Sequence, residues 1–109
     1  MAKSSELLQG TLDLLILRTL SLQPLHGVGV SDRIRQITNG VFQVKPGSLF
    51  PALHRLEEKG WILGEWSQTE EGRRARFYTL TAIGRKRLAS ETRAWKTAAG
   101  AVENVLTSE

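Results

Sequence analysis

Residues 81–107 constrain the fold more than any other segment, because they predict one long helix with an uncovered apolar seam. The segment contains no proline, and Thr81 is a suitable N-cap residue. Seam positions recur at spacings of four and three over about three heptads, as in a coiled coil. The seam consists of Leu88, Thr92, Trp95, Ala99, Val102 and Leu106. In a chain of 109 residues, no other segment remains to cover this seam.

A second strongly apolar helix is predicted near the N-terminus, over residues 6–21. Leu8, Leu12 and Leu15 lie on one side, and further leucines continue well round the helix. Such a helix must be covered on most of its circumference. A domain of this size buries only about 65% of the surface of its unfolded chain. We therefore expect a homodimer, in which the last helix packs on the first and last helices of the partner and these leucines join the seam.

Residues 27–38 are predicted to form the next helix. The Asn39-Gly40 pair that follows can supply the left-handed residue that ends it. The apolar face of this helix consists of Val30, Ile34 and Ile37.

The third predicted helix lies within KPGSLFPALHRLEEKGW, residues 45–61. Its core face consists of Leu49, Leu53 and Leu56. Pro46 suits the first helical position, where no donor is needed. Pro51 then deletes one backbone hydrogen bond, unless the helix begins at Ser48. The exposed first turns suit a helix that meets DNA phosphate with its positive end; an ordinary amphipathic surface helix is the alternative.

Residues 61–68 and 75–81 are rich in β-forming residues and flank a turn glycine, which predicts a hairpin. The formal net charge is +4, and residues 73–87 contain six basic residues and no acidic one. The basic residues of the hairpin are Arg73, Arg74 and Arg76. A ribbon with a basic tip can reach a DNA groove or backbone. The alternative is a solvated face that protects a sheet edge.

Several classes of protein are disfavoured. The chain has no cysteine and only two histidines, so disulfides and thiolate metal sites are excluded and no metal or cofactor is expected. His54 has no nucleophile or carboxylate at a catalytic spacing, and we expect no enzyme. Asp13 and Arg18 interrupt the leucine-rich run, so no membrane helix is predicted. We expect a cytoplasmic protein.

Three separated stretches resemble the PadR family of bacterial winged-helix transcription regulators. They are QGTLDLLILRTLSLQPLHGVGV, KPGSLFPALHRLEEKGWILGEW and GRRARFYTLTAIGRKRL, and the resemblance covers about residues 7–88 in register. It implies a mainly α fold with a small β-hairpin. Residues 1–80 would form the winged helix-turn-helix domain, with the hairpin as its wing. Residues 81–109 would form a dimerisation helix packed on the first helix of the partner.

The resemblance also implies a function: a sequence-specific repressor that binds a palindromic operator in double-stranded DNA as a homodimer. The third helix would enter the major groove, and the wing would lie on the backbone or in the minor groove. The DNA-binding residues it implies are Lys45, Ser48, Phe50, His54 and Arg55, with Arg73, Arg74 and Arg76 on the wing. Phe50 and Val28 stand where the family usually has tyrosine, so two hydroxyl groups are missing.

Trp95 has two interpretations. It can anchor the dimer interface, or it can form the wall of a pocket between subunits, where the resemblance implies a flat aromatic effector that releases the DNA. The alternative function for the whole chain is a protein-interaction or ligand-sensing module that keeps the winged fold without binding DNA. The missing hydroxyl groups at Phe50 and Val28 motivate that alternative.

Overall fold

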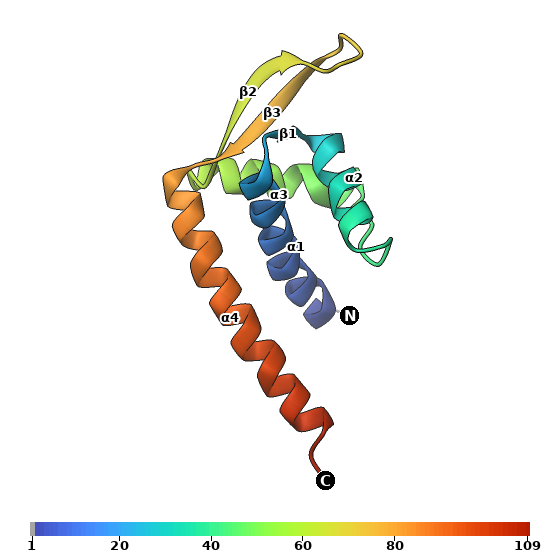
Figure 1. Ribbon diagram of the computed structural model, residues 1–109, viewed down its shortest axis with the longest axis vertical. Helices are drawn as coiled ribbons and strands as arrows, with labels where there is room; N and C mark the ends of the chain where they lie inside the picture. Colours follow the sequence, from blue (N-terminus) through green and yellow to red (C-terminus); the bar gives the residue numbers. More distant parts are fainter. Residues whose placement is uncertain (1) are drawn as a thin grey trace.

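The computed structural model describes residues 2–109, with side chains described from Gly10 onward. Along these residues the elements are α1 (Ala2–Leu22), β1 (Leu25–His26), α2 (Gly27–Ile37), α3 (Pro46–Glu58), β2 (Ile62–Gln68), β3 (Arg74–Leu80) and α4 (Ala82–Leu106). The predicted mainly α fold with a hairpin is confirmed. Figure 1 shows the hairpin and α4 projecting from a core of α1, α2 and α3. The molecule is elongated, with extents of 57 × 28 × 25 Å. No helix of this described part is both long and apolar enough to cross a membrane.

The sheet has one more strand than the sequence predicts. β2 and β3 pair antiparallel along their full length, from Ile62 opposite Leu80 to Gln68 opposite Arg74. The two residues of β1 pair with the other edge of β3, which makes the order β1-β3-β2. A two-residue strand is too short to show any periodicity. It forms because the link between α1 and α2 runs along the free edge of β3, where unpaired backbone groups are available.

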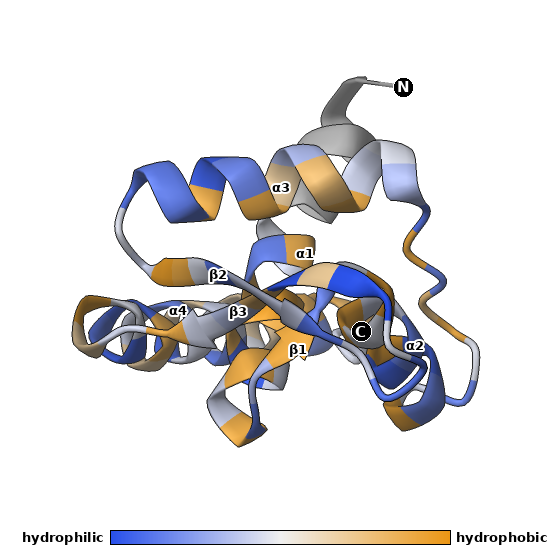
Figure 2. Ribbon diagram, turned by 90° about the horizontal axis from the view of Figure 1, so that it is seen from above, coloured by the Kyte–Doolittle hydropathy of each residue, from blue (hydrophilic) through white to orange (hydrophobic). Residues whose placement is uncertain are grey.

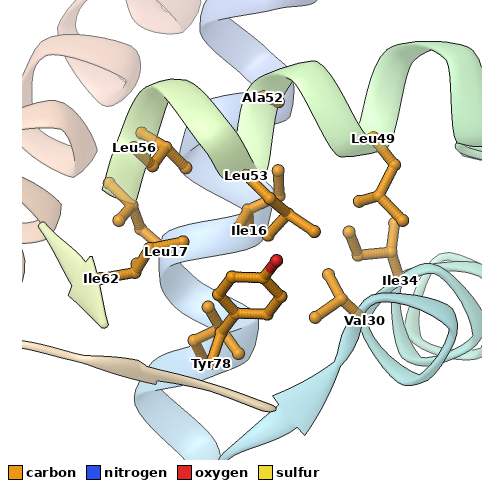
Figure 3. Packing of buried hydrophobic residues seen from close by; sticks show 11 residues of the cluster. Ile16, Leu17, Val30, Ile34, Leu49, Ala52, Leu53, Leu56, Ile62 and Tyr78 are labelled. Carbon is orange, nitrogen blue, oxygen red and sulfur yellow. The ribbon is translucent and has the colours of Figure 1, made fainter. Parts of the chain in front are cut away.

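The hydrophobic core lies where α1, α2 and α3 meet the sheet (Figure 3). It consists of Ile16, Leu17, Leu20, Val30, Ile34, Leu49, Ala52, Leu53, Leu56, Ile62 and Tyr78. The predicted core face of α3 is therefore confirmed, and Figure 2 shows the apolar residues of α3 gathered on the side turned toward the rest of the molecule. The predicted face of α2 is buried at Val30 and Ile34 but not at Ile37, which is 52% exposed. Ile37 is the last residue of the helix, and the chain turns away from the core there.

Side chains cap the starts of α2 and α4. The Thr81 Oγ1 atom accepts a hydrogen bond from the Gly84 N–H at 3.0 Å, so the predicted cap of α4 is confirmed. His26, for which the sequence suggested no role, caps α2 by accepting the Gly29 N–H at Nδ1, 3.1 Å away. Asn39, at φ 53°, adopts the predicted left-handed conformation just after α2. The two caps thus satisfy backbone N–H groups at the starts of α2 and α4.

Candidate nucleic-acid interface

The N-terminal end of α3 is open to solvent. Of the two possible starts, the helix takes the earlier one, with Pro46 at its first position and Pro51 inside. The Lys45 carbonyl accepts the N–H groups of Ser48 and Leu49, at 3.0 and 2.9 Å. Residues 45–48 are all exposed. The first turn of a helix carries N–H groups without intrahelical acceptors and a positive partial charge, so this end can receive an anion such as phosphate.

The residues predicted on α3 fall on two sides of the helix. Ser48 and Arg55, seven residues apart, line a groove that faces α1. Phe50 and His54, one turn apart, lie on another side of the helix. The His54 side chain is 81% exposed, with its Nε2 atom 4.0 Å from a carboxylate oxygen of Glu58. Ser48 and Arg55 thus lie on the side of α3 that borders the groove, and His54 lies on a side that is open to solvent.

Phe50 joins α3 to the start of α2. Its ring lies so close to Gly27 that a Cβ atom there would come within 2.7 Å of the ring edge. The ring is nevertheless partly solvent-accessible, since Phe50 is 47% exposed. Val28, the next residue of α2, is 59% exposed. The two positions where the resemblance implies a tyrosine hydroxyl therefore both present partly exposed apolar side chains.

Arg55 is held by α1. Its guanidinium donates to the Asp13 carboxylate, and the two side chains are only 29% and 18% exposed. Burial raises the pKa of the Asp13 carboxyl above its usual value, and the neighbouring Arg55 offsets part of that rise. The pair therefore joins α3 to α1. A contact between Arg55 and DNA stays a prediction, and the guanidinium would have to share its donors with Asp13.

Arg76 is held by α3 in a similar way. Its Nη2 atom donates to Oε2 of Glu57 at 2.5 Å, and the same oxygen accepts the Gly64 N–H at 3.2 Å. The hydrogen bond from Arg76 is the main reason why the pKa of Glu57 lies below its usual value. Of the three predicted wing arginines, Arg76 alone has this internal partner on α3 among the residues that the structure describes.

The outer part of the wing carries Arg73, Arg74 and an exposed tryptophan. Trp66 is 58% exposed, and the guanidinium carbon of Arg74 lies 4.8 Å from its ring centroid. Arg73 and Arg74 are both exposed. Trp66 was not predicted as a site residue from the sequence; pairing β2 with β3 in register would have found it, because Trp66 lies directly opposite Arg76. An aromatic ring beside an exposed guanidinium group is a surface suited to phosphate and base contacts.

The helix seam predicted for the dimer is largely uncovered in the single chain. Trp95, Val102 and Leu106 are 51%, 58% and 73% exposed, whereas Leu88, Thr92 and Ala99 are half-buried. A groove of about 450 Å³ also opens between α1, the link before α3 and the first half of α3. Its lining includes Leu12, Leu15, Phe42, Val44, Lys45 and Ser48. The side chain of Leu8 lies outside the described residues.

Comparison with known proteins identifies the family. Residues 16–90 match the family described as "Transcriptional regulator PadR-like family". The chain is 30% identical to an uncharacterised protein of Lysinibacillus sphaericus over 91 residues, 84% of each chain. It is 34% identical to a transcriptional regulator of Mycobacterium tuberculosis over 70 residues, 64% of this chain and 62% of that one.

Solved structures agree over nearly the whole chain. A PadR-like transcriptional regulator of Bacillus cereus superposes with a TM-score of 0.81 at 25% identity, covering 95% of this chain and 99% of that chain. A PadR family transcription regulator of Clostridium difficile superposes with a TM-score of 0.75 at 27% identity, covering 87% and 97%. The winged-helix fold and the family resemblance are confirmed. The chain therefore belongs to the PadR-like family, whose members are DNA-binding transcriptional regulators and not enzymes.

Proposed function

We propose that this chain is a homodimeric repressor that binds a palindromic operator, with α3 in the major groove and the wing on the adjoining backbone or in the minor groove. The observation that carries the proposal is the combination of an open, positive α3 start with exposed arginines on a wing joined to that helix. Since its ligand would be chromosomal DNA, the protein would act in the bacterial cytoplasm.

On the DNA, each group of exposed residues would contact a different part of the duplex. Lys45, Ser48 and the open amides of the first turn of α3 would bind phosphate. Phe50 and His54, on the solvent-exposed side of the helix, would approach base edges, where the Phe50 ring suits a thymine methyl group. Arg73 and Arg74 would bind the backbone or the minor groove from the wing. Most of these contacts are electrostatic, so affinity would fall steeply with salt as counterions are released.

Dimerisation would complete the apolar surfaces that one chain leaves uncovered. Residues 1–80 would form the DNA-binding unit, and residues 81–109 would pack on α1 and α4 of the partner. The exposed fractions of Trp95, Val102 and Leu106 support this arrangement, because large apolar side chains in a row on one helix indicate an interface. In a twofold dimer the two α3 helices would lie about 34–36 Å apart, one turn of DNA.

A small aromatic effector would bind beside Trp95 between the subunits and release the DNA. The half-exposed indole supports the proposal, since a flat ligand can stack on it. The test is fluorescence of a variant in which Trp61 and Trp66 are replaced by phenylalanine, titrated with planar aromatic molecules, while DNA binding is measured on the wild-type protein with and without the same molecules. Quenching together with weaker DNA binding is the expected result. Quenching without any effect on DNA binding would contradict a regulatory role for the effector.

The second candidate function is a protein-interaction or ligand-sensing module that does not bind DNA. The observation that favours it is the apolar surface at Phe50 and Val28, where hydroxyl groups for phosphate are missing. Selection of bound sequences from a random pool of double-stranded DNA separates the two functions. We expect enrichment of a palindrome with half-sites one helical turn apart. Failure to enrich any sequence at low salt would favour the module.

A further inference from the structure

One face of the wing is organised around Arg76. Strand residues alternate between faces, and β2 and β3 pair with Gly64 opposite Tyr78 and Trp66 opposite Arg76. These four residues therefore share one face of the ribbon, and Arg74 joins them two positions along β3. This is the face from which Arg76 reaches α3.

A single carboxylate on α3 contacts both strands of the wing. Glu57 accepts the Arg76 side chain of β3 at 2.5 Å and the backbone N–H of Gly64 in β2 at 3.2 Å. The Glu57 side chain is 24% exposed and that of Arg76 is 34% exposed, so both are partly withdrawn from water. Charge-assisted hydrogen bonds in such surroundings are stronger and more directional than exposed ion pairs.

Gly64 provides the room that this contact needs. A Cβ atom at this position would lie 2.5 Å from Nε of Arg76 and 3.0 Å from its guanidinium carbon. Arg76 thus crosses β2 at the one place where that strand has no side chain. This steric observation is independent of the hydrogen bonds, and it supports the same role for Arg76.

The contacts continue outward from Arg76. Its guanidinium carbon lies 5.9 Å from the centroid of the Trp66 ring, and that of Arg74 lies 4.8 Å from the same centroid. Arg74 is exposed and Arg76 is not. The positive charge of Arg76 faces Glu57 within the chain, whereas no side-chain partner other than the Trp66 ring is seen for Arg74 in the described residues.

We propose that Glu57 is a positioning residue, which fixes the wing against α3 through Arg76 so that Trp66 and Arg74, rather than Arg76, contact the DNA. The inference rests on the proposed DNA binding and refines it. Arg76, one of the three predicted wing contacts, would act within the protein. Trp66, which the sequence did not predict, would take its place on the DNA surface.

The substitution Glu57→Gln tests this by the sign of its effect. Removal of a negative charge near DNA strengthens binding if charge alone matters. Loss of the contact that orients the wing weakens DNA binding. The matched control is Glu58→Gln, because Glu58 is adjacent, acidic and 74% exposed, and its partner is the exposed His54. We expect weaker binding for Glu57→Gln, by about tenfold, and equal or tighter binding for Glu58→Gln.

Salt dependence separates positioning from direct contact. Binding of a labelled duplex that carries the enriched palindrome is measured by fluorescence anisotropy over a range of salt. Each lost phosphate contact lowers the slope of log K against log salt by about 0.9. For Arg74→Gln we expect the slope to fall by this amount for each wing. For Arg76→Gln and Trp66→Ala we expect weaker binding with an unchanged slope.

A double-substitution cycle and a steric variant complete the test. Glu57→Gln combined with Arg76→Gln is expected to bind no more weakly than either single variant, because both break one contact. Gly64→Ala is expected to mimic them by displacing Arg76. Thermal unfolding is measured for every variant, and binding is measured well below each transition, so that loss of fold is not read as loss of contact.

The results distinguish the two proposals. If the wild-type protein binds no duplex at low salt, the proposed function fails and this inference fails with it. If the wild-type protein binds but Glu57→Gln leaves affinity unchanged or tighter, the positioning role alone is wrong. The positioning role is also wrong if Arg76→Gln lowers the slope of log K against log salt as much as Arg74→Gln does.

Discussion

The wing and α4 both project from the same three-helix core, but they are attached to it differently. The wing is tied to α3 by the Glu57 carboxylate, which contacts β2 and β3. α4 is fixed by its first turns, where Thr81 caps the helix and Gly84 lies against the Trp61 carbonyl. Beyond them, α4 presents exposed apolar side chains and extends past the other elements (Figure 1).

The two projections differ in whether one chain completes their contacts. The wing satisfies its central charged group internally, so its orientation does not require a second subunit. α4 leaves large apolar side chains in water, which supports the proposal that its distal part packs on a second subunit. Substitutions in the wing should therefore change DNA affinity in an intact dimer. Substitutions in distal α4 should change the oligomeric state first, and DNA affinity as a consequence.

The largest effect is expected for Val102→Asp in distal α4. Val102 is 58% exposed in the single chain, so the fold of the chain should survive. In the dimer the aspartate would be buried without a partner, and we expect dimer affinity to fall about a hundredfold or more. Light scattering coupled to size exclusion measures the mass. The control is Glu103→Ala, beside it but off the seam; equal effects of the two substitutions would contradict the assignment of the seam.

Gly84→Ala comes next, because it attacks the attachment of α4 to the core. A Cβ atom at Gly84 would lie 2.0 Å from the Trp61 carbonyl oxygen, a backbone atom that cannot move aside. We expect the free energy of unfolding to fall by about 3 kcal/mol, measured by urea denaturation. Gly100→Ala is the matched control in the same helix, since no atom lies near its Cβ position in the single chain.

The Gly100→Ala substitution also tests how closely two α4 helices would approach each other. Alanine at an open helical glycine position gains about 1 kcal/mol of helix propensity. Gly100→Ala should therefore stabilise the dissociated chain. If α4 helices approach each other closely at Gly100, the same substitution weakens the dimer. Stabilisation of both forms would place Gly100 outside the interface.

A smaller effect is expected for the paired substitution Arg73→Gln and Arg74→Gln on the wing. Both side chains are exposed, so the fold and the dimer should be unchanged. We expect DNA binding at moderate salt to weaken about tenfold or more, with a shallower salt dependence. Anisotropy titrations at several salt concentrations measure both quantities. Unchanged DNA binding combined with altered binding to another protein would favour the interaction module.

The smallest effect concerns acid stability of the wing attachment. The pKa of Glu57 is lower in the folded protein than its ordinary value of 4.5, mainly because of the hydrogen bond from Arg76. Its contribution to stability is therefore present above that value and is lost as the pH falls through the folded pKa. Glu57→Gln should reduce the free energy of unfolding at neutral pH and should approach the wild type in acid. A difference that is constant with pH would contradict this.

Local features of the fold could be predicted from the sequence. Leu49, Leu53 and Leu56 recur at helical spacing because they share one buried face, and all three are core residues. Thr81 caps α4 and Asn39 follows α2 in a left-handed conformation because such residues act on backbone groups only a few positions away. These effects depend on near neighbours in the chain, which the sequence displays directly.

Contacts between distant residues could not be predicted in the same way. Asp13 and Arg55 are 42 positions apart, and Glu57 and Arg76 are 19 apart. Their pairing depends on the angle between helices and on the register of the hairpin. The candidate site was therefore predicted as residues of α3 and the wing without their internal partners, and the structure divides its arginines into those held by acids and those open to solvent.

The stoichiometry of the protein on DNA tests how the wing and α4 share the function. We propose that the wing and α3 form a complete DNA-reading unit in each chain and that α4 joins two such units. Sedimentation equilibrium of the complex with a duplex carrying the enriched palindrome measures how many 12.1 kDa chains are bound. We predict two chains per palindrome and two chains in the free protein. One chain per duplex, or a free protein that is a monomer at the concentrations used for binding, would contradict this arrangement.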